Sequence, residues 1–156
     1  MRAFGVMEVT GSTQRRLIVA LVGYSALLGI ALLAPTSGTQ STMASWVSDL
    51  GVWLGFSPET ATQERAEFLC NVAILAPVSA LGSLVWPRTT WRDWTAYAFL
   101  VAGLVELTQG LVLPSRTASY VDIVANTLGG LVGAGVVALS RRRRAAGTPP
   151  TPPAAR

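Results

Sequence analysis

Four long apolar runs, separated by short polar segments, organise this chain. They lie at residues 17–35, 68–86, 95–113 and 121–139. Each run has about 19 residues, enough at about 1.5 Å per residue to cross a hydrocarbon core about 30 Å thick. Hydrophobic residues make up 51% of the chain and charged residues only 13%, a balance typical of a protein whose main solvent is lipid. The pattern therefore predicts an all-α fold, namely a four-transmembrane-helix bundle.

The arginines predict how this bundle is oriented. Arginine supplies all 12 basic residues, and most of them precede the first run, lie between the second and third runs, or follow the fourth run. Positively charged loops tend to stay in the cytoplasm. We therefore predict a multi-pass protein of the cell membrane with both termini in the cytoplasm. Only Arg65 and Arg116 fall on the predicted outer side.

The same pattern predicts the boundaries of the parts. We expect a cytoplasmic segment at residues 1–16, a membrane domain at residues 17–139 and a basic, proline-rich, disordered cytoplasmic tail at residues 140–156. The tail begins with the run Arg141–Arg144. A run of this kind stops translocation and contacts anionic lipid, so we predict no nucleic-acid partner.

The first outer loop carries a further helical pattern. Large apolar residues recur there at helical spacing: Met43, Trp46, Val47, Leu50 and Leu54. This spacing predicts a short amphipathic helix at the outer surface of the membrane, or else a helix that caps the bundle. The following Ser57-Pro58-Glu59 has the order of an N-cap, a first helical proline and a first-turn acid, which predicts that the second membrane helix begins there.

Polar side chains interrupt the apolar runs near their predicted outer ends. Ionisable groups in hydrocarbon are costly, so they normally face a protein interior and mark a site. Helical spacing places the polar residues of each run on one face, and Arg116 lies in the turn above them. We predict a ligand-binding cluster of six residues: Asn71, Glu106, Gln109, Arg116, Asp122 and Asn126. Small residues on the fourth run are predicted to let another helix pack closely: Gly129, Gly130 and Gly133.

The same polar residues also fit structural roles. Ser119 and Asp122 match a capping box at the start of the last helix. Gln109 and Asn126 suit hydrogen bonds between helices. A buried pair of Glu106 with an arginine that only fixes the fold also fits the pattern.

The residue types limit the chemistry. The chain has no histidine and a single cysteine, Cys70, so we predict no metal site, no internal disulfide and no cofactor. An enzyme acting on a lipid headgroup would use Glu106 and Asp122 as general acid and base. Histidine, a nucleophile motif and metal-ligand spacing are all missing, so the residues favour a non-catalytic protein. Two more roles fit the pattern: a small transporter or flippase component with Glu106 as proton carrier, and a purely structural subunit.

Over about residues 66–138 the chain resembles the VanZ-like membrane proteins. The resemblance rests on ordered elements: Asn71-Val72, Pro77, Glu106-x-x-Gln109, Arg116, Asp122, Asn126-Thr127-Leu128-Gly129-Gly130 and Gly133. One departure is the second run, which reads NVAILAPVSALG where the family usually has an aromatic-rich NVLLFVPFG type. If those aromatics shape a binding surface, the choice of ligand differs.

This resemblance implies a function in the cell envelope. The name-giving member is linked to resistance against teicoplanin, a lipidated glycopeptide that acts at the outer membrane face. By similarity, we expect binding of a lipid headgroup or lipidated glycopeptide at the outer leaflet, with an effect on teicoplanin susceptibility. The partners expected on this basis are membrane lipids, including a cell-wall lipid intermediate or lipoglycopeptide, and a second copy of the chain or another membrane protein.

Overall fold

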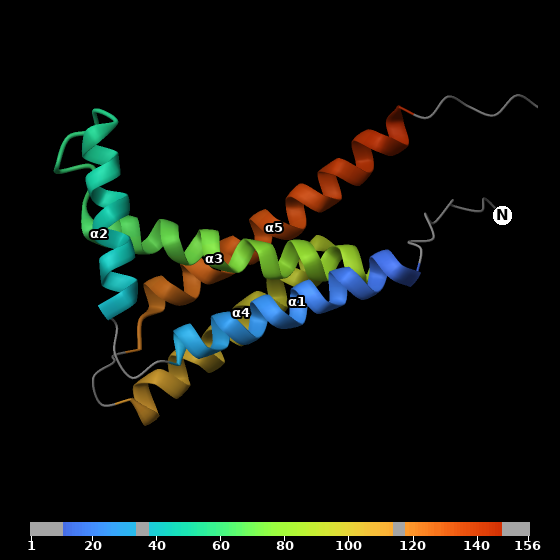
Figure 1. Cartoon of the computed structure of the whole chain (residues 1–156), viewed down its shortest axis with the longest axis horizontal. Helices are drawn as coiled ribbons and strands as arrows, with labels where there is room; N and C mark the ends of the chain where they lie inside the picture. Colours follow the sequence, from blue (N-terminus) through green and yellow to red (C-terminus); the bar gives the residue numbers. More distant parts are fainter. Residues whose placement is uncertain (1–10, 34–37, 114–117, 148–156) are drawn as a thin grey trace, which may run out of the picture.

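The computed structural model describes residues 11–33, 38–113 and 118–147. These residues form five helices and no strand: α1 (Gly11–Leu32), α2 (Gly38–Trp53), α3 (Gln63–Val85), α4 (Trp91–Val112) and α5 (Tyr120–Ala146). Helices α1, α3, α4 and α5 are long and apolar enough to cross a membrane, and they form an elongated bundle with α2 across one end (Figure 1). The predicted all-α fold with four apolar spans is confirmed.

Small residues fill the inside of the bundle, and large apolar residues cover its outside. Ala66, Ala102, Ala125 and Ala134 are buried, whereas side chains such as Leu111, 77% exposed, cover the outer faces. In water this arrangement would be unfavourable. In lipid, tails solvate the large side chains and small residues let helix backbones approach closely.

Glycines set the closest approach between helices. A Cβ added at Gly129 or Gly133 of α5 would overlap the backbone carbonyl oxygen of Val72 or Ala76 on α3. A Cβ at Gly130 would overlap the Cβ of Ala98 on α4. Helix α5 therefore packs against both α3 and α4 at distances that larger residues do not allow.

Helix α1 is attached mainly to α3. The hydroxyl of Tyr24 donates a hydrogen bond of 2.7 Å to the carbonyl oxygen of Ile74. This carbonyl lies close in sequence to Pro77, which has no N–H and interrupts the hydrogen-bond ladder inside α3. The tyrosine thus joins α1 to the irregular part of α3.

Removing this hydroxyl should loosen α1. We expect Tyr24→Phe to lower the free energy of unfolding by about 0.5–1.5 kcal/mol, because the aromatic ring is kept and one hydrogen bond is lost. Unfolding of the detergent-solubilised protein measures the change. Ser25→Ala, at an exposed position of the same helix, is the matched control. Equal stability of Tyr24→Phe and Ser25→Ala would contradict this attachment.

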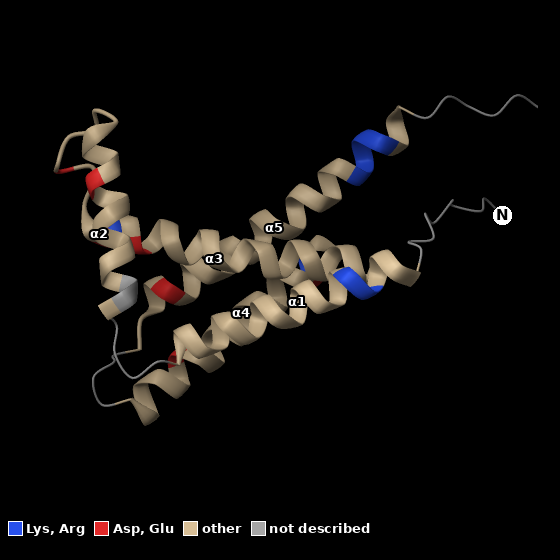
Figure 2. Ribbon diagram, in the orientation of Figure 1, with Lys and Arg blue, Asp and Glu red and all other residues tan. Residues whose placement is uncertain are grey.

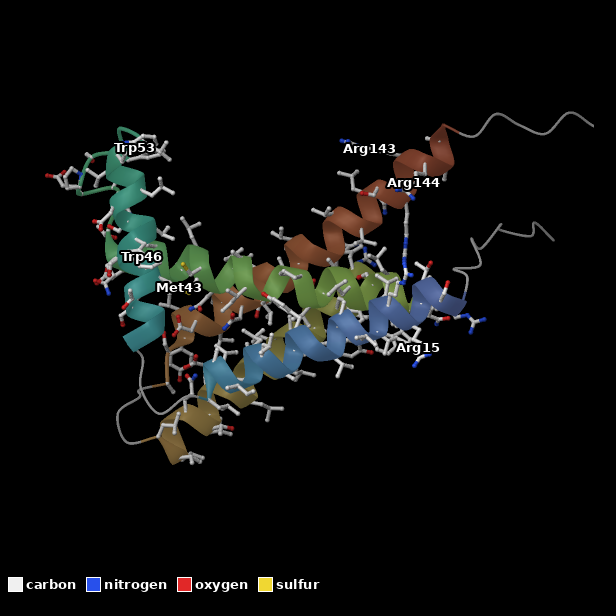
Figure 3. The ribbon with its side chains drawn as sticks, in the orientation of Figure 1. Arg15, Met43, Trp46, Trp53, Arg143 and Arg144 are labelled. Carbon is white, nitrogen blue, oxygen red and sulfur yellow. The ribbon has the colours of Figure 1, made fainter. Side chains whose placement is uncertain are left out.

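The helix predicted in the first outer loop is present as α2. Its inner face packs on the segment before α3: Ala44 is fully buried, and the Ser48 hydroxyl donates to the carbonyl oxygen of Ala61. Its other face carries Trp46 and Trp53, which are 70% and 80% exposed and are labelled in Figure 3. A face of exposed large apolar residues is what an interfacial helix presents to the membrane surface.

The third helix begins later than Ser57-Pro58-Glu59 predicts. Ser57 to Ala61 form a turn, in which the N–H groups of Thr60 and Ala61 donate to the carbonyl oxygen of Ser57. The Ser57 hydroxyl meets the Thr60 hydroxyl instead of capping a helix. Helix α3 begins at Gln63, and the N-cap is Thr62, whose side chain accepts the N–H of Arg65. The predicted start is therefore wrong by about one helical turn.

Helix α5 extends beyond the end predicted for the fourth span. Residues 140–146, placed in a disordered tail by the sequence pattern, continue α5 as far as Ala146. Arginine and alanine are strong helix formers, and basic residues near a helix C-terminus interact favourably with the macrodipole. The proline-rich residues 148–156 lie outside the described residues.

Charge divides the molecule into two ends (Figure 2). Arginines gather where α1 begins and α5 ends, which we call the arginine end. Most acidic residues lie toward the other end, beside α2, which we call the α2 end. Figure 3 shows Arg15, Arg143 and Arg144 at the arginine end. Under the orientation predicted from the arginines, the α2 end faces outward.

Candidate functional site

The predicted polar residues lie inside the bundle at the α2 end. Glu106 and Gln109 on α4 are each 4% exposed, and Asn126 on α5 is 5% exposed. Asn71 on α3 and Asp122 on α5 are half-buried. Glu106 and Asn126 each lie about 9 Å from the end of their helix, at about 1.5 Å per residue. Arg116, the remaining member of the predicted cluster, lies outside the described residues.

Glu106 joins α4 to the beginning of α5. Its Oε2 atom accepts a hydrogen bond of 2.7 Å from the backbone N–H of Ser119. Ser119 is the N-cap of α5, and its hydroxyl accepts the N–H of Asp122 at 3.3 Å. Half of the predicted capping box is therefore confirmed, and the other half is replaced, because the N–H of Ser119 donates to Glu106 and not to Asp122. A carboxylate near a helix N-terminus is favourable because the first N–H groups have no partner inside the helix.

Asn71 and Asp122 join α3 to α5. The side-chain amide of Asn71 donates to Asp122 Oδ1 at 2.7 Å. Asn71 directly precedes Val72, whose backbone carbonyl oxygen meets α5 at Gly129. This pair therefore holds the two helices together on the α2 side of their closest contact.

Gln109 contacts a different part of the bundle. Its side-chain amide donates at 2.6 Å to the carbonyl oxygen of Leu32, the last residue of α1. The final carbonyl groups of a helix have no partner inside it, so Gln109 satisfies the end of α1. This bond accounts for the burial of Gln109 without a ligand.

Asn126 carries an acceptor that the fold leaves unsatisfied. Its Oδ1 atom is buried and has no hydrogen-bond partner among the described residues. Leaving a buried acceptor unpaired costs about 1–3 kcal/mol, and such groups in native proteins usually have a functional reason or an ordered water. Asn126 lies one turn after Asp122, next to the Asn71–Asp122 pair.

The cluster is rich in oxygen acceptors. The carboxylates of Glu106 and Asp122 already accept hydrogen bonds within the fold, and the amide oxygen of Asn126 is buried without a partner among the described residues. An amide oxygen of this kind suits a hydroxyl, amide or ammonium donor. Among the described residues, no three side chains of the metal-binding types gather, and Cys70 is a half-buried thiol without a disulfide. The arrangement is therefore suited to recognising a polar group that carries hydrogen-bond donors.

Two partners in these contacts cannot be found from the sequence. They are the backbone N–H of Ser119 and the carbonyl oxygen of Leu32. Backbone groups leave no sequence signature, because any residue supplies a carbonyl oxygen and almost any supplies an N–H. The capping pattern at Ser119 and Asp122 assigns the Ser119 N–H to Asp122, so it does not predict the bond to Glu106.

Comparison with known proteins gives a match to a protein family. No curated protein and no solved structure matches the chain. The family model described as VanZ/LLP1 matches residues 16–141, a range that includes the polar cluster and almost all of the four apolar helices. The chain therefore belongs to the VanZ-like family of membrane proteins.

Proposed function

We propose that this protein binds the polar headgroup of an amphiphile at the α2 end, in the outer leaflet, without transforming it chemically. The ligand is a membrane lipid, such as a cell-wall lipid intermediate, or a lipidated glycopeptide of the teicoplanin type. Both classes join an apolar chain to a headgroup rich in hydroxyl and amide donors. By binding such a molecule, the protein would alter glycopeptide susceptibility.

The observation that carries this proposal is the buried Oδ1 of Asn126, which has no partner among the described residues. Asn71 and Gln109 each donate a hydrogen bond to another helix, whereas Asn126 Oδ1 accepts none from the described residues. One donor from a ligand, either directly or through one water, would satisfy this oxygen. Relief of the cost of an unpaired acceptor then contributes favourably to binding.

The end of the molecule at which Asn126 lies also exposes apolar surface. The large apolar side chains of α2 lie exposed at the same end of the molecule, among them Met43, Trp46 and Trp53. An acyl chain would remain among the exposed apolar helix faces while its headgroup reached the acceptors of the cluster. An amphiphile needs both a polar site and an apolar surface, and the α2 end has both.

Catalysis has less support from the contacts. Glu106 accepts a backbone N–H and Asp122 accepts a side-chain amide, so both carboxylates are held as acceptors in the fold. Acid–base catalysis needs a carboxyl group placed to exchange a proton with the substrate. No contact in the described residues distinguishes one of these two carboxyl groups as the acid and the other as the base.

The test is a titration of the full-length protein in nanodiscs with teicoplanin and with its deacylated core. We expect the acylated compound to bind at least about tenfold more tightly, since burying an acyl chain contributes about 0.8 kcal/mol per CH₂. Asn126→Leu should weaken that binding about tenfold, the effect of one hydrogen bond of about 1.4 kcal/mol. The same titration of the wild type and Asn126→Leu with a purified cell-wall lipid intermediate shows whether this lipid or teicoplanin binds more tightly.

Stability measurements on the same variant separate binding from a structural role. Asn126 Oδ1 has no bond to lose among the described residues, so Asn126→Leu should be as stable as the wild type or more stable. Thr127→Val is the control, because the Thr127 hydroxyl donates to the carbonyl oxygen of Ile123 within α5. If Asn126→Leu unfolds more easily than Thr127→Val while binding is unchanged, Asn126 is a structural residue and the proposal is wrong.

A further inference from the structure

A pocket of about 200 Å³ lies at the arginine end, between the α3–α4 turn and α5. Its polar lining comes from Ser83, Thr89, Thr90, Trp91 and Arg141, and small or apolar residues of α5 such as Ala138 complete its wall. A water molecule in the liquid occupies about 30 Å³, so the pocket has room for a group the size of a phosphate. It lies at the opposite end from the polar cluster and takes no part in the function proposed above.

Arg141 is held in a fixed position in this pocket. Its Nη2 donates at 2.6 Å to the carbonyl oxygen of Ser83, and its Nη1 donates at 3.4 Å to that of Pro87. A guanidinium group has five N–H donors, so these two bonds orient the side chain and leave further donors at the pocket. An arginine that is already oriented loses less conformational entropy when it binds an anion.

The pocket has one cationic side chain in its lining. Of the described residues that line it, only Arg141 is charged. Thr90 and Trp91 form the beginning of α4, where a capping box pairs the N–H of Thr90 with the Asp93 carboxylate and the N–H of Asp93 with the Thr90 hydroxyl. The other N–H groups of this first turn have no acceptor inside the helix. Asp93 is the acidic residue nearest in sequence to the residues that line the pocket. Its carboxylate accepts hydrogen bonds from the N–H and the hydroxyl of Thr90.

Aromatic residues place the pocket at the level of lipid headgroups. Trp86 and Trp91 are 50% and 37% exposed on either side of the α3–α4 turn, and tryptophan prefers the membrane–water interface. Arg92 stacks over the Trp91 ring, with its Cζ 5.3 Å from the ring centre. The pocket and Arg141 therefore lie where phosphate groups of lipids are concentrated.

We propose that this pocket binds a phosphate group, with Arg141 as the principal ligand. Arginine matches phosphate geometry through paired N–H donors, and the N–H groups in the first turn of α4 that lie outside the capping box add further donors. The source of the phosphate is the headgroup of an anionic lipid in the leaflet at the arginine end, or a soluble phosphate compound with the same chemistry.

The experiment titrates the full-length protein in detergent with short-chain phosphatidic acid, with the matching diacylglycerol, and with inorganic phosphate. Binding of phosphatidic acid is expected, and binding of diacylglycerol is not. Arg141→Gln should weaken phosphatidic acid binding about tenfold or more, as expected when a charge-assisted hydrogen bond is lost. Arg143→Gln removes the same charge from an exposed position nearby and should change affinity less than about threefold. Tight binding of inorganic phosphate would indicate a soluble ligand, and binding of the lipid alone would indicate a headgroup.

Ala138→Leu tests the pocket without removing the arginine. The larger side chain fills the cavity, while the bonds from Arg141 to the end of α3 and to the following turn remain. Because these bonds remain, Ala138→Leu can still test the pocket if Arg141→Gln does not fold. Loss of phosphatidic acid binding in Ala138→Leu supports the proposal. The proposal would be overturned if Arg141→Gln and Arg143→Gln weakened binding equally, or if binding were unchanged in Ala138→Leu. It would also be overturned if diacylglycerol bound as tightly as phosphatidic acid.

Discussion

Gly133→Leu is expected to prevent stable packing of α3 against α5. The first added carbon would overlap the carbonyl oxygen of Ala76, which belongs to the backbone of α3 and has no alternative rotamer. Overpacking of this kind costs about 1–3 kcal/mol and sometimes more, and here the upper end or beyond is expected because two backbones must separate. Size-exclusion chromatography and thermal unfolding of the detergent-solubilised protein measure the loss.

Gly135 provides a matched control for this prediction. It lies two residues further along α5, and a Cβ added there would meet nothing within 4 Å. Gly135→Leu should therefore behave like the wild type. If Gly133→Leu and Gly135→Leu unfold alike, close contact between α3 and α5 does not determine the stability of the bundle.

Glu106→Ala is expected to lower the free energy of unfolding by about 1.5–3 kcal/mol. The change removes the acceptor for the Ser119 N–H at the beginning of α5, and hydrogen bonds to charged groups contribute about this much. Glu106→Gln keeps a carbonyl oxygen in place of Oε2, so it should retain most of the stability. Thermal unfolding of the three proteins under identical conditions measures both effects.

The same pair of variants distinguishes binding from catalysis. A binding site should retain part of its affinity in Glu106→Gln, whereas a catalytic acid would lose its activity completely. Thr108→Val is the control on α4, because the exposed Thr108 hydroxyl donates to the carbonyl oxygen of Leu104 in the same helix. Turnover of a lipid headgroup by the wild type that disappears in Glu106→Gln would identify an enzyme and contradict a purely binding role.

The sequence predicts the membrane architecture well because lipid imposes simple requirements. A span must be about 20 residues long and apolar, and the four runs meet that condition. Burial of Glu106 and Asn126 also follows from the cost of placing polar groups in hydrocarbon. The helical period of α5 places Asn126, Gly129 and Gly133 on one face, and all three are buried in the structure.

Partners across helices are much harder to predict. Glu106 bonds to a backbone N–H, and Gln109 bonds to the last carbonyl of α1. Such contacts depend on how far each helix extends and on its rotation, neither of which hydropathy determines. The predicted start of α3 is misplaced because the Ser57 turn uses the same residue types as a helix cap.

The arginine run illustrates a different difficulty. From the sequence, residues 141–144 are four equivalent cations beside a membrane. In the structure Arg141 is half-buried and bonds to two carbonyl oxygens of another segment, whereas Arg142 and Arg143 are exposed. Arg141 differs from the other two because it lies next to the end of α3. That position depends on how α5 packs against α3, which the sequence pattern does not reveal.

The most direct measurement of headgroup binding at the α2 end is native mass spectrometry of the wild type, Asn126→Leu and Thr127→Val, each purified from membranes under the same mild detergent. Headgroup binding at the cluster predicts that the wild type and Thr127→Val retain the same lipid-sized adduct and that Asn126→Leu loses it while remaining folded. An adduct of equal abundance in all three proteins would contradict a site at Asn126 and leave the polar cluster with a structural role.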